Sequence, residues 1–298
     1  EFRRVLFRSA EIRVFRGHEE KVMSVAWSHD GKRLVSAAKD QTARVWDVDD
    51  VKEPLILSGH THWVYAAAWG RDNHEIVTTS LDGTQRRWDT SNIVTRTVLR
   101  GHADTVRGLD FSPDGKTIAT GSLDGTVRVW NAEGAGEAMV LSGHTQPTEG
   151  IRWSPKGNRF ISWAKDGTAR IWSADGRGMP AIISARDSVF LDIDWSPDGE
   201  RFVTAAKDGW IRLWSQDGAE IAQIHKPTSS EFKLFLSTFD PAGKRVLIHD
   251  TLDPRVYIWD LDAPEKLVLL GEHDSQVRRI AIWSRDGRQV LTIALDGI

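Results

Sequence analysis

Residues 101–131 read GHADTVRGLDFSPDGKTIATGSLDGTVRVWN. Short segments of alternating apolar and polar residues are separated here by turn residues, which is typical of β-strands. The run SPDG at 112–115 predicts a turn, because proline presets the first turn position and glycine supplies the positive φ that closes it. The run LDG at 123–125 predicts a tight hairpin turn. The predicted strands cover residues 106–111, 117–121, 126–130 and 138–141.

The same pattern recurs along the chain every 42 residues. One series of tryptophans keeps this spacing and continues at Trp259: Trp46, Trp88, Trp130, Trp172 and Trp214. A series of turn aspartates keeps it as well: Asp40, Asp82, Asp124, Asp166 and Asp208, followed by Asp253 and Asp296. A repeat of four short strands at this period predicts the blades of an all-β propeller, with seven units in the chain.

Several units open with Gly-His and close with Trp-Asp, as at Gly17-His18 and Trp46-Asp47. This signature resembles the WD40 repeat. The resemblance covers residues 10–298 and implies a seven-bladed WD40 β-propeller with four-stranded antiparallel blades and an incomplete last blade. The regular period and the Ser-Pro-Asp-Gly turns are similar to bacterial-type WD40 arrays.

The two ends of the sequence carry separate expectations. Residues 1–9, EFRRVLFRS, match the translation of a widely used sequencing adapter, so we interpret them as a non-native leader. The propeller is expected over 10–298. It begins with an outer strand at 11–15, and the sequence stops before the third strand of blade seven.

The resemblance also implies a buried hydrogen-bonded set in each unit, formed by histidine, a hydroxyl residue, aspartate and tryptophan. Four units carry all four residues: His18, Ser36, Asp40 and Trp46; His60, Thr78, Asp82 and Trp88; His102, Thr120, Asp124 and Trp130; His144, Ser162, Asp166 and Trp172. A buried aspartate needs such partners, and histidine supplies one.

The later units depart from this pattern. Unit five has Ala185-Arg186 in place of Gly-His, so Arg186 is a candidate partner for Asp208. Unit six has His249 at the hydroxyl position and Pro254 in place of the turn glycine.

A hydrolase triad is the competing interpretation of histidine, aspartate and serine in one unit. A catalytic triad occurs once and opens into a pocket, whereas these sets recur in successive units. The histidines lie one unit apart, too far to share a metal ion, and the chain has no cysteine. The sequence therefore predicts no catalytic, metal or cofactor site, and an enzyme is the least favoured class.

Partner binding is predicted for the loops of one rim, which vary while the frame stays constant. In the WD40 family the residue before the turn aspartate often contacts partners, as does one near the start of the first strand. The positions before the turn aspartates are Lys39, Leu81, Leu123, Lys165, Lys207, Leu252 and Leu295. The positions near the start of the first strand are Met23, Tyr65, Arg107, Glu149 and Leu191. Trp63 lies outside the repeating tryptophan series and is a candidate anchor for a partner. Trp63 fits ordinary packing equally well. The three lysines of this set suit an acidic peptide or are simply solvated.

Composition narrows the choice of partners. The net charge is −3 without a basic cluster, so nucleic acid is not expected. No apolar run of about 18 residues predicts a membrane helix. We therefore expect a cytoplasmic scaffold for protein or peptide partners, of unknown oligomeric state. The alternative is a sensor domain of a larger signalling protein with an NTPase, kinase or effector domain.

Overall fold

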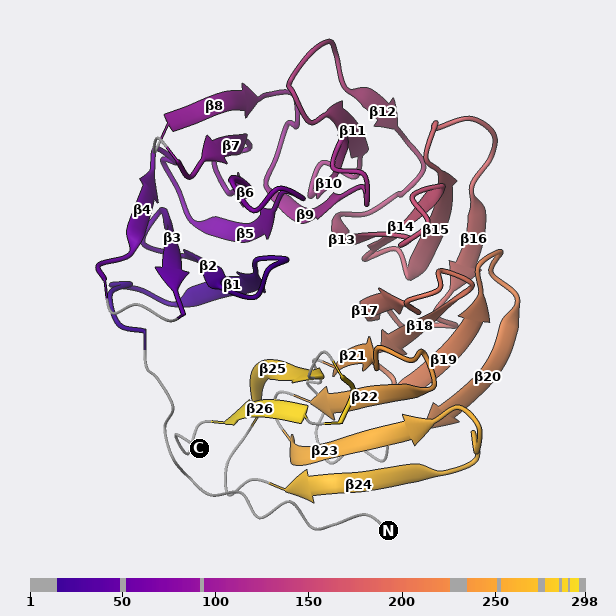
Figure 1. Cartoon of the computed structure of the whole chain (residues 1–298). Coiled ribbons are helices and arrows are strands. Elements are labelled where there is room, and N and C mark those ends of the chain that lie inside the picture. The colour runs from indigo at the N-terminus through magenta and orange to yellow at the C-terminus, as the bar shows by residue number, and fades with distance from the viewer. Residues whose placement is uncertain are drawn as a thin grey trace.

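The computed structural model describes residues 15–48, 52–91, 94–225, 235–250, 253–272, 277–283, 286–288 and 290–294. Antiparallel sheets stand around a central axis like the blades of a propeller (Figure 1). Six sheets have four strands and one has two, and no helix occurs within these ranges. The predicted all-β propeller of the WD40 type is confirmed.

The first three blades follow the order of the chain. Blade one comprises β1 (Val22–Trp27), β2 (Arg33–Ala38), β3 (Thr42–Asp47) and β4 (Leu55–Ser58). Blade two comprises β5 (Val64–Trp69), β6 (Glu75–Ser80), β7 (Gln85–Asp89) and β8 (Val94–Leu99). Blade three comprises β9 (Val106–Phe111), β10 (Thr117–Ser122), β11 (Val127–Asn131) and β12 (Met139–Leu141).

The remaining blades continue around the ring. Blade four comprises β13 (Thr148–Trp153), β14 (Arg159–Ala164), β15 (Thr168–Ser173) and β16 (Ala181–Ser184). Blade five comprises β17 (Phe190–Trp195), β18 (Arg201–Ala206), β19 (Trp210–Ser215) and β20 (Glu220–His225). Blade six comprises β21 (Phe235–Phe239), β22 (Arg245–Asp250), β23 (Asp253–Asp260) and β24 (Leu267–Glu272). The two-stranded sheet contains β25 (Val277–Trp283) and β26 (Val290–Ala294).

The turn at 112–115 shows how the sequence sets the first hairpin of a blade. The Ser112 hydroxyl donates to the Asp114 carboxylate at 2.6 Å and accepts the N–H of Thr117 at 3.0 Å. Gly115 has a φ of +73°, and its N–H donates to the Ser112 carbonyl at 2.8 Å. Such local bonds satisfy the backbone where the ladder stops, so the two strands begin in register.

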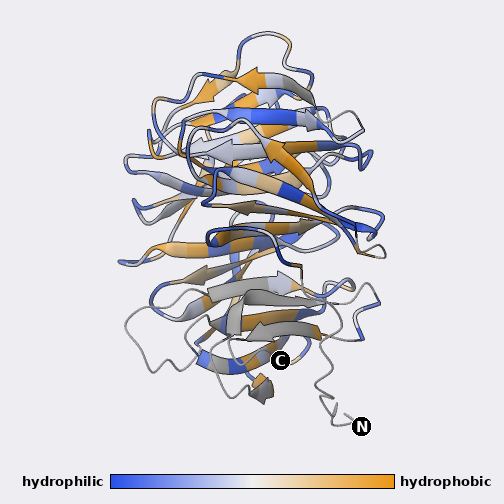
Figure 2. Ribbon diagram, turned by 90° about the vertical axis from the view of Figure 1, so that its left-hand side faces the viewer, coloured by the Kyte–Doolittle hydropathy of each residue, from blue (hydrophilic) through white to orange (hydrophobic). Residues whose placement is uncertain are grey.

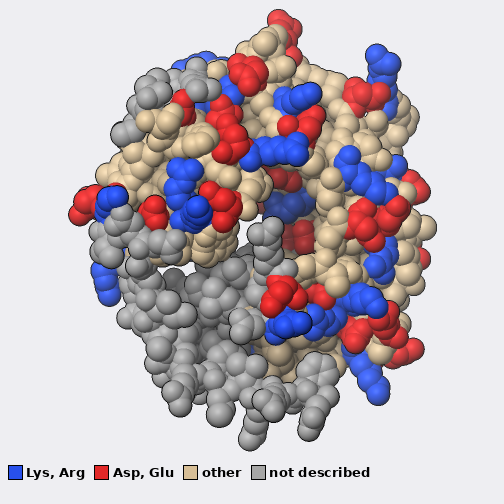
Figure 3. All heavy atoms as spheres, in the orientation of Figure 1, with Lys and Arg blue, Asp and Glu red and all other residues tan. Residues whose placement is uncertain are grey.

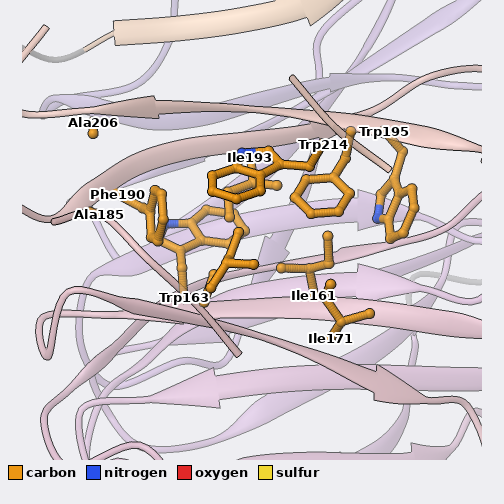
Figure 4. Close-up of a cluster of buried hydrophobic side chains, with 12 residues drawn as sticks. Ile161, Trp163, Ile171, Ala185, Phe190, Ile193, Trp195, Ala206 and Trp214 are labelled. Atoms are coloured by element: carbon orange, nitrogen blue, oxygen red, sulfur yellow. The ribbon is translucent and has the colours of Figure 1, made fainter. Parts of the chain in front are cut away.

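The hydrophobic core lies between neighbouring blades. Figure 2 shows apolar residues along the strands and hydrophilic residues in the loops at the two rims. Figure 4 shows the layer between blades four and five, where Trp163 and Phe190 lie at one end, Trp195 lies at the other, and Ile193 lies between them. Each blade therefore buries its apolar faces by contact with its neighbours.

The two ends of the chain leave part of the domain prediction open. Residues 1–9 and most of the predicted strand at 11–15 lie outside the described residues. Phe15 is described but belongs to no strand, and its ring lies 5.6 Å from the Trp46 ring.

Trp27, on the first strand of blade one, is 44% exposed, whereas Trp69 at the same position of blade two is 4% exposed.

Candidate functional site

The structure brings the four polar side chains together in each of the first four blades. In blade three, His102 Nδ1 lies 2.9 Å from Asp124 Oδ2, and His102 Nε2 lies 2.9 Å from Thr120 Oγ1. The Trp130 indole donates to the same hydroxyl at 2.8 Å. The matching distances in blades one, two and four lie between 2.7 and 3.0 Å.

These contacts define one proton arrangement along the chain of bonds. The indole N–H can only donate, so the hydroxyl accepts it and donates its own hydrogen to histidine Nε2. Histidine Nδ1–H then donates to the aspartate. Burial lowers the pKa of His102, and the same cause lowers the pKa of His144, so both imidazoles are neutral at pH 7.

The aspartate of each set stays ionised because it accepts several hydrogen bonds. Burial acts to raise the pKa of Asp124, but the bonds from Thr126, Ala103 and His102 outweigh it and lower the pKa to about 2. Thr126 donates from both its hydroxyl and its N–H, at 2.7 and 2.8 Å. The carboxylate is fully engaged, and so is the Thr120 hydroxyl, which leaves no free nucleophile or base in the set.

Blades five and six lack complete sets, and one sequence prediction for them is wrong. Trp214 still donates to Thr204 Oγ1 at 2.9 Å. Arg186, however, pairs with Glu220 at 2.9 Å, and Asp208 lies 3.9 Å from the guanidinium of Arg212. The expected pair of Asp208 with Arg186 is absent because a nearer carboxylate in β20 takes the guanidinium.

Blade six shows what the loss of the hydroxyl does. With His249 at that position, the Trp259 indole donates to the carbonyl of Pro264 at 2.9 Å instead. His249 and Trp259 are both buried. A buried indole N–H needs an acceptor, so it turns to the backbone when no hydroxyl is offered.

The residues predicted to meet a partner gather at one rim, which we call the hairpin rim. The N–H of each residue before the turn aspartate donates to a carbonyl in the loop that enters the first strand. These bonds are Lys39 to Lys21, Leu81 to Trp63, Leu123 to Thr105, Lys165 to Pro147 and Lys207 to Val189. The turns between second and third strands therefore share one rim with the entrances to the first strands. Leu252 and Leu295 lie outside the described residues.

A β-bulge marks the first strand of five successive blades at this rim. In β5, Val64 pairs with Ser80 and Ala66 with Thr79, so the register skips Tyr65. The same skip occurs in the other four blades, at Met23, Arg107, Glu149 and Leu191. A bulge re-aims its side chain and is a feature of functional edges. The five bulged residues are the strand positions that the sequence singled out.

Side chains of neighbouring blades join across the hairpin rim. Arg107 Nη1 lies 2.6 Å from Glu149 Oε2, and Lys165 Nζ lies 3.4 Å from Glu149 Oε1. The Arg107 guanidinium lies 5.7 Å from the centre of the Tyr65 ring. One acidic side chain thus stands between two basic ones, and the basic groups are 30% and 54% exposed.

Trp63 combines packing with rim exposure. Its side chain is half-buried, and Lys39 Nζ lies 3.6 Å from the centre of its ring. Trp63 belongs to blade two and Lys39 to blade one, so this cation–π contact ties two blades together. This contact accounts for a packing role, and the role of Trp63 as a partner anchor stays a prediction.

The central channel contains a charged group that the sequence reasoning missed. A cavity of about 380 Å³ is lined by Asp110 and Arg152 together with small residues such as Ala66 and Gly108. Acidic and basic side chains are visible inside the central opening (Figure 3). Comparing the inward positions of β5, β9, β13 and β17 would have found them, because Ala68, Asp110, Arg152 and Asp194 recur every 42 residues.

The channel carboxylates also connect neighbouring blades. Asp110 accepts the N–H of Trp153 at 2.7 Å, and Asp194 accepts the N–H of Phe239 at 3.2 Å. Burial raises the pKa of Asp110 to about 6 and also raises the pKa of Asp194. Burial acts to lower the pKa of Arg152, but the charges of nearby carboxylates raise it. The channel carboxylates therefore link each blade to the next by accepting a backbone hydrogen bond from it.

Within the described residues, no group of three or more histidine, cysteine, aspartate or glutamate side chains could hold a metal ion. No helix long and apolar enough to cross a membrane was found in the same part of the chain.

Comparison with known proteins places the chain among propellers. The family described as IFT122 first beta-propeller matches residues 63–297, and the WD domain, G-beta repeat matches residues 9–47. THO complex subunit 3 of Arabidopsis thaliana is 46% identical over 43 residues, which cover 14% of each chain. The probable cytosolic iron-sulfur protein assembly protein 1 of Kluyveromyces lactis is 38% identical over 40 residues, or 13% of this chain and 12% of the relative.

Coronin-7 of Rattus norvegicus is 35% identical over 65 residues, which cover 22% of this chain and 7% of the relative. The matches thus span between 7% and 14% of the length of these relatives. Each match covers 40 to 65 residues, so the similarity to these relatives is limited to one or two repeats.

Proposed function

Because the chain belongs to the family of WD40-type β-propellers described as IFT122 first beta-propeller, we propose that it is a protein-interaction scaffold whose hairpin rim holds a partner. The row of five bulged residues carries this proposal. A bulge in the first strand of a blade turns one side chain out of the ladder, and at a binding rim that side chain would be presented to a partner. The recurrence in five successive blades makes it a property of the rim.

The buried sets support the same function and speak against catalysis. In blades one to four, the histidine, hydroxyl and aspartate of each set hydrogen-bond to one another within the blade. These bonds hold the blade rigid beneath the rim. A rigid frame lowers the entropy that a partner must overcome on binding, since the contact residues are already positioned. We therefore propose a protein partner, with no enzymatic reaction and no nucleic-acid or membrane partner.

The location and pathway of the chain are part of the proposal as well. We place it in the cytoplasm, in signal transduction. A second candidate is a sensor domain of a larger signalling protein, which the regular 42-residue spacing favours. The two candidates differ in which domains are joined to the propeller, so the coding sequence upstream of the propeller distinguishes them.

The test compares partners captured by three forms of the immobilised chain. The forms are the unaltered chain, the double variant Tyr65→Ala/Arg107→Ala at the bulges, and Lys116→Ala at the opposite rim. Lys116 is exposed and follows the turn at 112–115, so it reports non-specific loss. We expect a subset of captured proteins to be lost from the bulge variant alone. Equal capture by all three forms, with equal melting temperatures, would refute the proposal.

A further inference from the structure

We propose that the hairpin rim binds an acidic peptide segment and that Glu149 occupies the place of a partner carboxylate until that segment arrives. This inference rests on the proposed function and names the chemical class of the partner. It follows from three observations at the rim: the sign of the exposed charges, the position of Glu149 between two cations, and the covering of the aromatic faces.

The charges at the partner positions of the hairpin rim are mostly positive, although the chain is acidic as a whole. The five described positions before the turn aspartates carry three lysines and two leucines. The bulged positions add Arg107 and one acidic residue, Glu149. Lys165 and Lys207 are exposed. The turn aspartates beneath these positions are tied up in hydrogen bonds within the blade, so the basic groups at the partner positions favour an anionic partner.

Glu149 is placed as a substitute ligand. Its two carboxylate oxygens face Arg107 at 2.6 Å and Lys165 at 3.4 Å. Arg107 comes from blade three, whereas Glu149 and Lys165 come from blade four. A carboxylate held between two cations from different blades shows the geometry that a partner's glutamate or aspartate would use. The Glu149 side chain as a whole is 25% exposed, and a partner carboxylate that displaced it would take over the same two cations.

The aromatic side chains of the rim favour a peptide over a nucleic acid. Binding of single-stranded nucleic acid relies on aromatic faces on which bases stack. Here Lys39 Nζ covers the Trp63 ring at 3.6 Å, and the Arg107 guanidinium lies over Tyr65. The rings thus present cations to the solvent. The leucines at 81 and 123 lie between the basic groups, which suits a segment that mixes acidic and apolar residues.

Exposed carboxylates in the adjoining loops sharpen this expectation. Asp104 and Asp187 lie in the loops that enter β9 and β17. They interrupt the basic area and would repel a continuous polyanion. Separate acidic side chains on a peptide can instead meet the cations one by one.

The test measures fluorescence anisotropy of a labelled decapeptide in which four glutamates alternate with leucine and serine. A peptide with lysine at every glutamate position serves as the probe control. The 298-residue chain is titrated in unaltered form and as Glu149→Gln, Lys165→Glu and Lys116→Glu. The last variant makes the same charge reversal at the opposite rim, so it controls for the change in net charge.

Opposite effects are expected from the two rim variants. Glu149→Gln should bind the acidic peptide about threefold tighter, since it frees two cations, and Lys165→Glu should bind it about fivefold more weakly. Lys116→Glu should match the unaltered chain, and the lysine peptide should not bind. Raising the salt concentration from about 0.05 to 0.5 M should abolish the differences, because exposed charges are screened.

Three outcomes would overturn the inference. One is the absence of binding to the acidic peptide, and another is equal weakening by Lys165→Glu and Lys116→Glu. The third is tighter, rim-dependent binding of a ten-nucleotide thymidine oligomer, which would assign the rim to nucleic acid. If the bulge variant still loses protein partners in the capture experiment while the acidic peptide fails to bind, the scaffold function stands and only the acidic class is wrong.

Discussion

Replacing Asp124 with asparagine tests whether the buried sets hold the blades. The carboxylate accepts four hydrogen bonds: two from Thr126, one from Ala103 N–H at 2.9 Å and one from His102 at 2.9 Å. Asparagine keeps one oxygen and turns an NH₂ group toward two donors. The variant therefore loses two bonds and creates donor–donor conflicts in a site where the side chain is only 10% exposed.

The pKa of this carboxyl provides the magnitude. It falls from 3.8 to about 2 on folding. At about 1.4 kcal/mol for each pKa unit, the ionised carboxylate contributes about 2 kcal/mol at pH 7. With the donor conflicts added, Asp124→Asn should lower the free energy of unfolding by about 2–4 kcal/mol. For a chain of this length, that corresponds to a melting temperature lower by about 3–6 °C.

The chain provides its own control in Asp208→Asn. Asp208 occupies the same position in blade five, its side chain is 30% exposed, and its carboxylate has no histidine partner among the described residues. It accepts the N–H of Trp210 at 3.1 Å, and its guanidinium neighbour is 3.9 Å away. The Asp208 variant should cost less than about 1 kcal/mol. Both variants are compared by urea denaturation followed through tryptophan fluorescence.

The pH dependence checks the cause. Because the pKa of Asp124 is lower in the folded chain than in the unfolded chain, its contribution is present above about pH 4 and is lost as the pH falls toward 2. The difference between the unaltered chain and Asp124→Asn should shrink over that window. Equal costs for Asp124→Asn and Asp208→Asn at pH 7 would refute the role assigned to the buried sets.

Two further predictions concern the channel and the core. The pKa of Asp110 is raised from 3.8 to about 6, so its ionisation lowers stability as the pH rises from about 4 to 6. Asp110→Asn should raise the free energy of unfolding by roughly 2–3 kcal/mol at pH 8 relative to its effect at pH 3, as measured by urea denaturation. A Cβ on Gly150 would lie 2.0 Å from Cζ2 of Trp163, so Gly150→Ala should cost about 1–3 kcal/mol. Adding Trp163→Ala to Gly150→Ala should cost less than the sum of the two single changes, and strict additivity would show that the two residues do not compete for space.

The repeat could be predicted from the sequence because its decisive contacts lie within one blade. The turn at 112–115, the hairpin at 123–125 and the bond from His102 to Asp124 join residues at most 22 positions apart. Each blade repeats these local rules, so a spacing of 42 residues in the sequence becomes one blade in space. Residue type and position within the unit were sufficient to predict the blades and the turns, and the resemblance to the WD40 repeat added the four polar sets.

The side-chain contacts of the hairpin rim join neighbouring blades, and no spacing within a unit encodes them. Which cation meets Glu149, and that Lys39 covers Trp63, follows from how far one blade is rotated against the next. The bulge at Tyr65 was equally hidden, since the ladder register is set by the pairing of two strands. For the same reason Arg186 was assigned to Asp208, when tertiary packing brought Glu220 nearer. The sequence by itself determined the repeating frame because that frame is built from local bonds; only the tertiary structure decided the rim, because its side chains come from neighbouring blades.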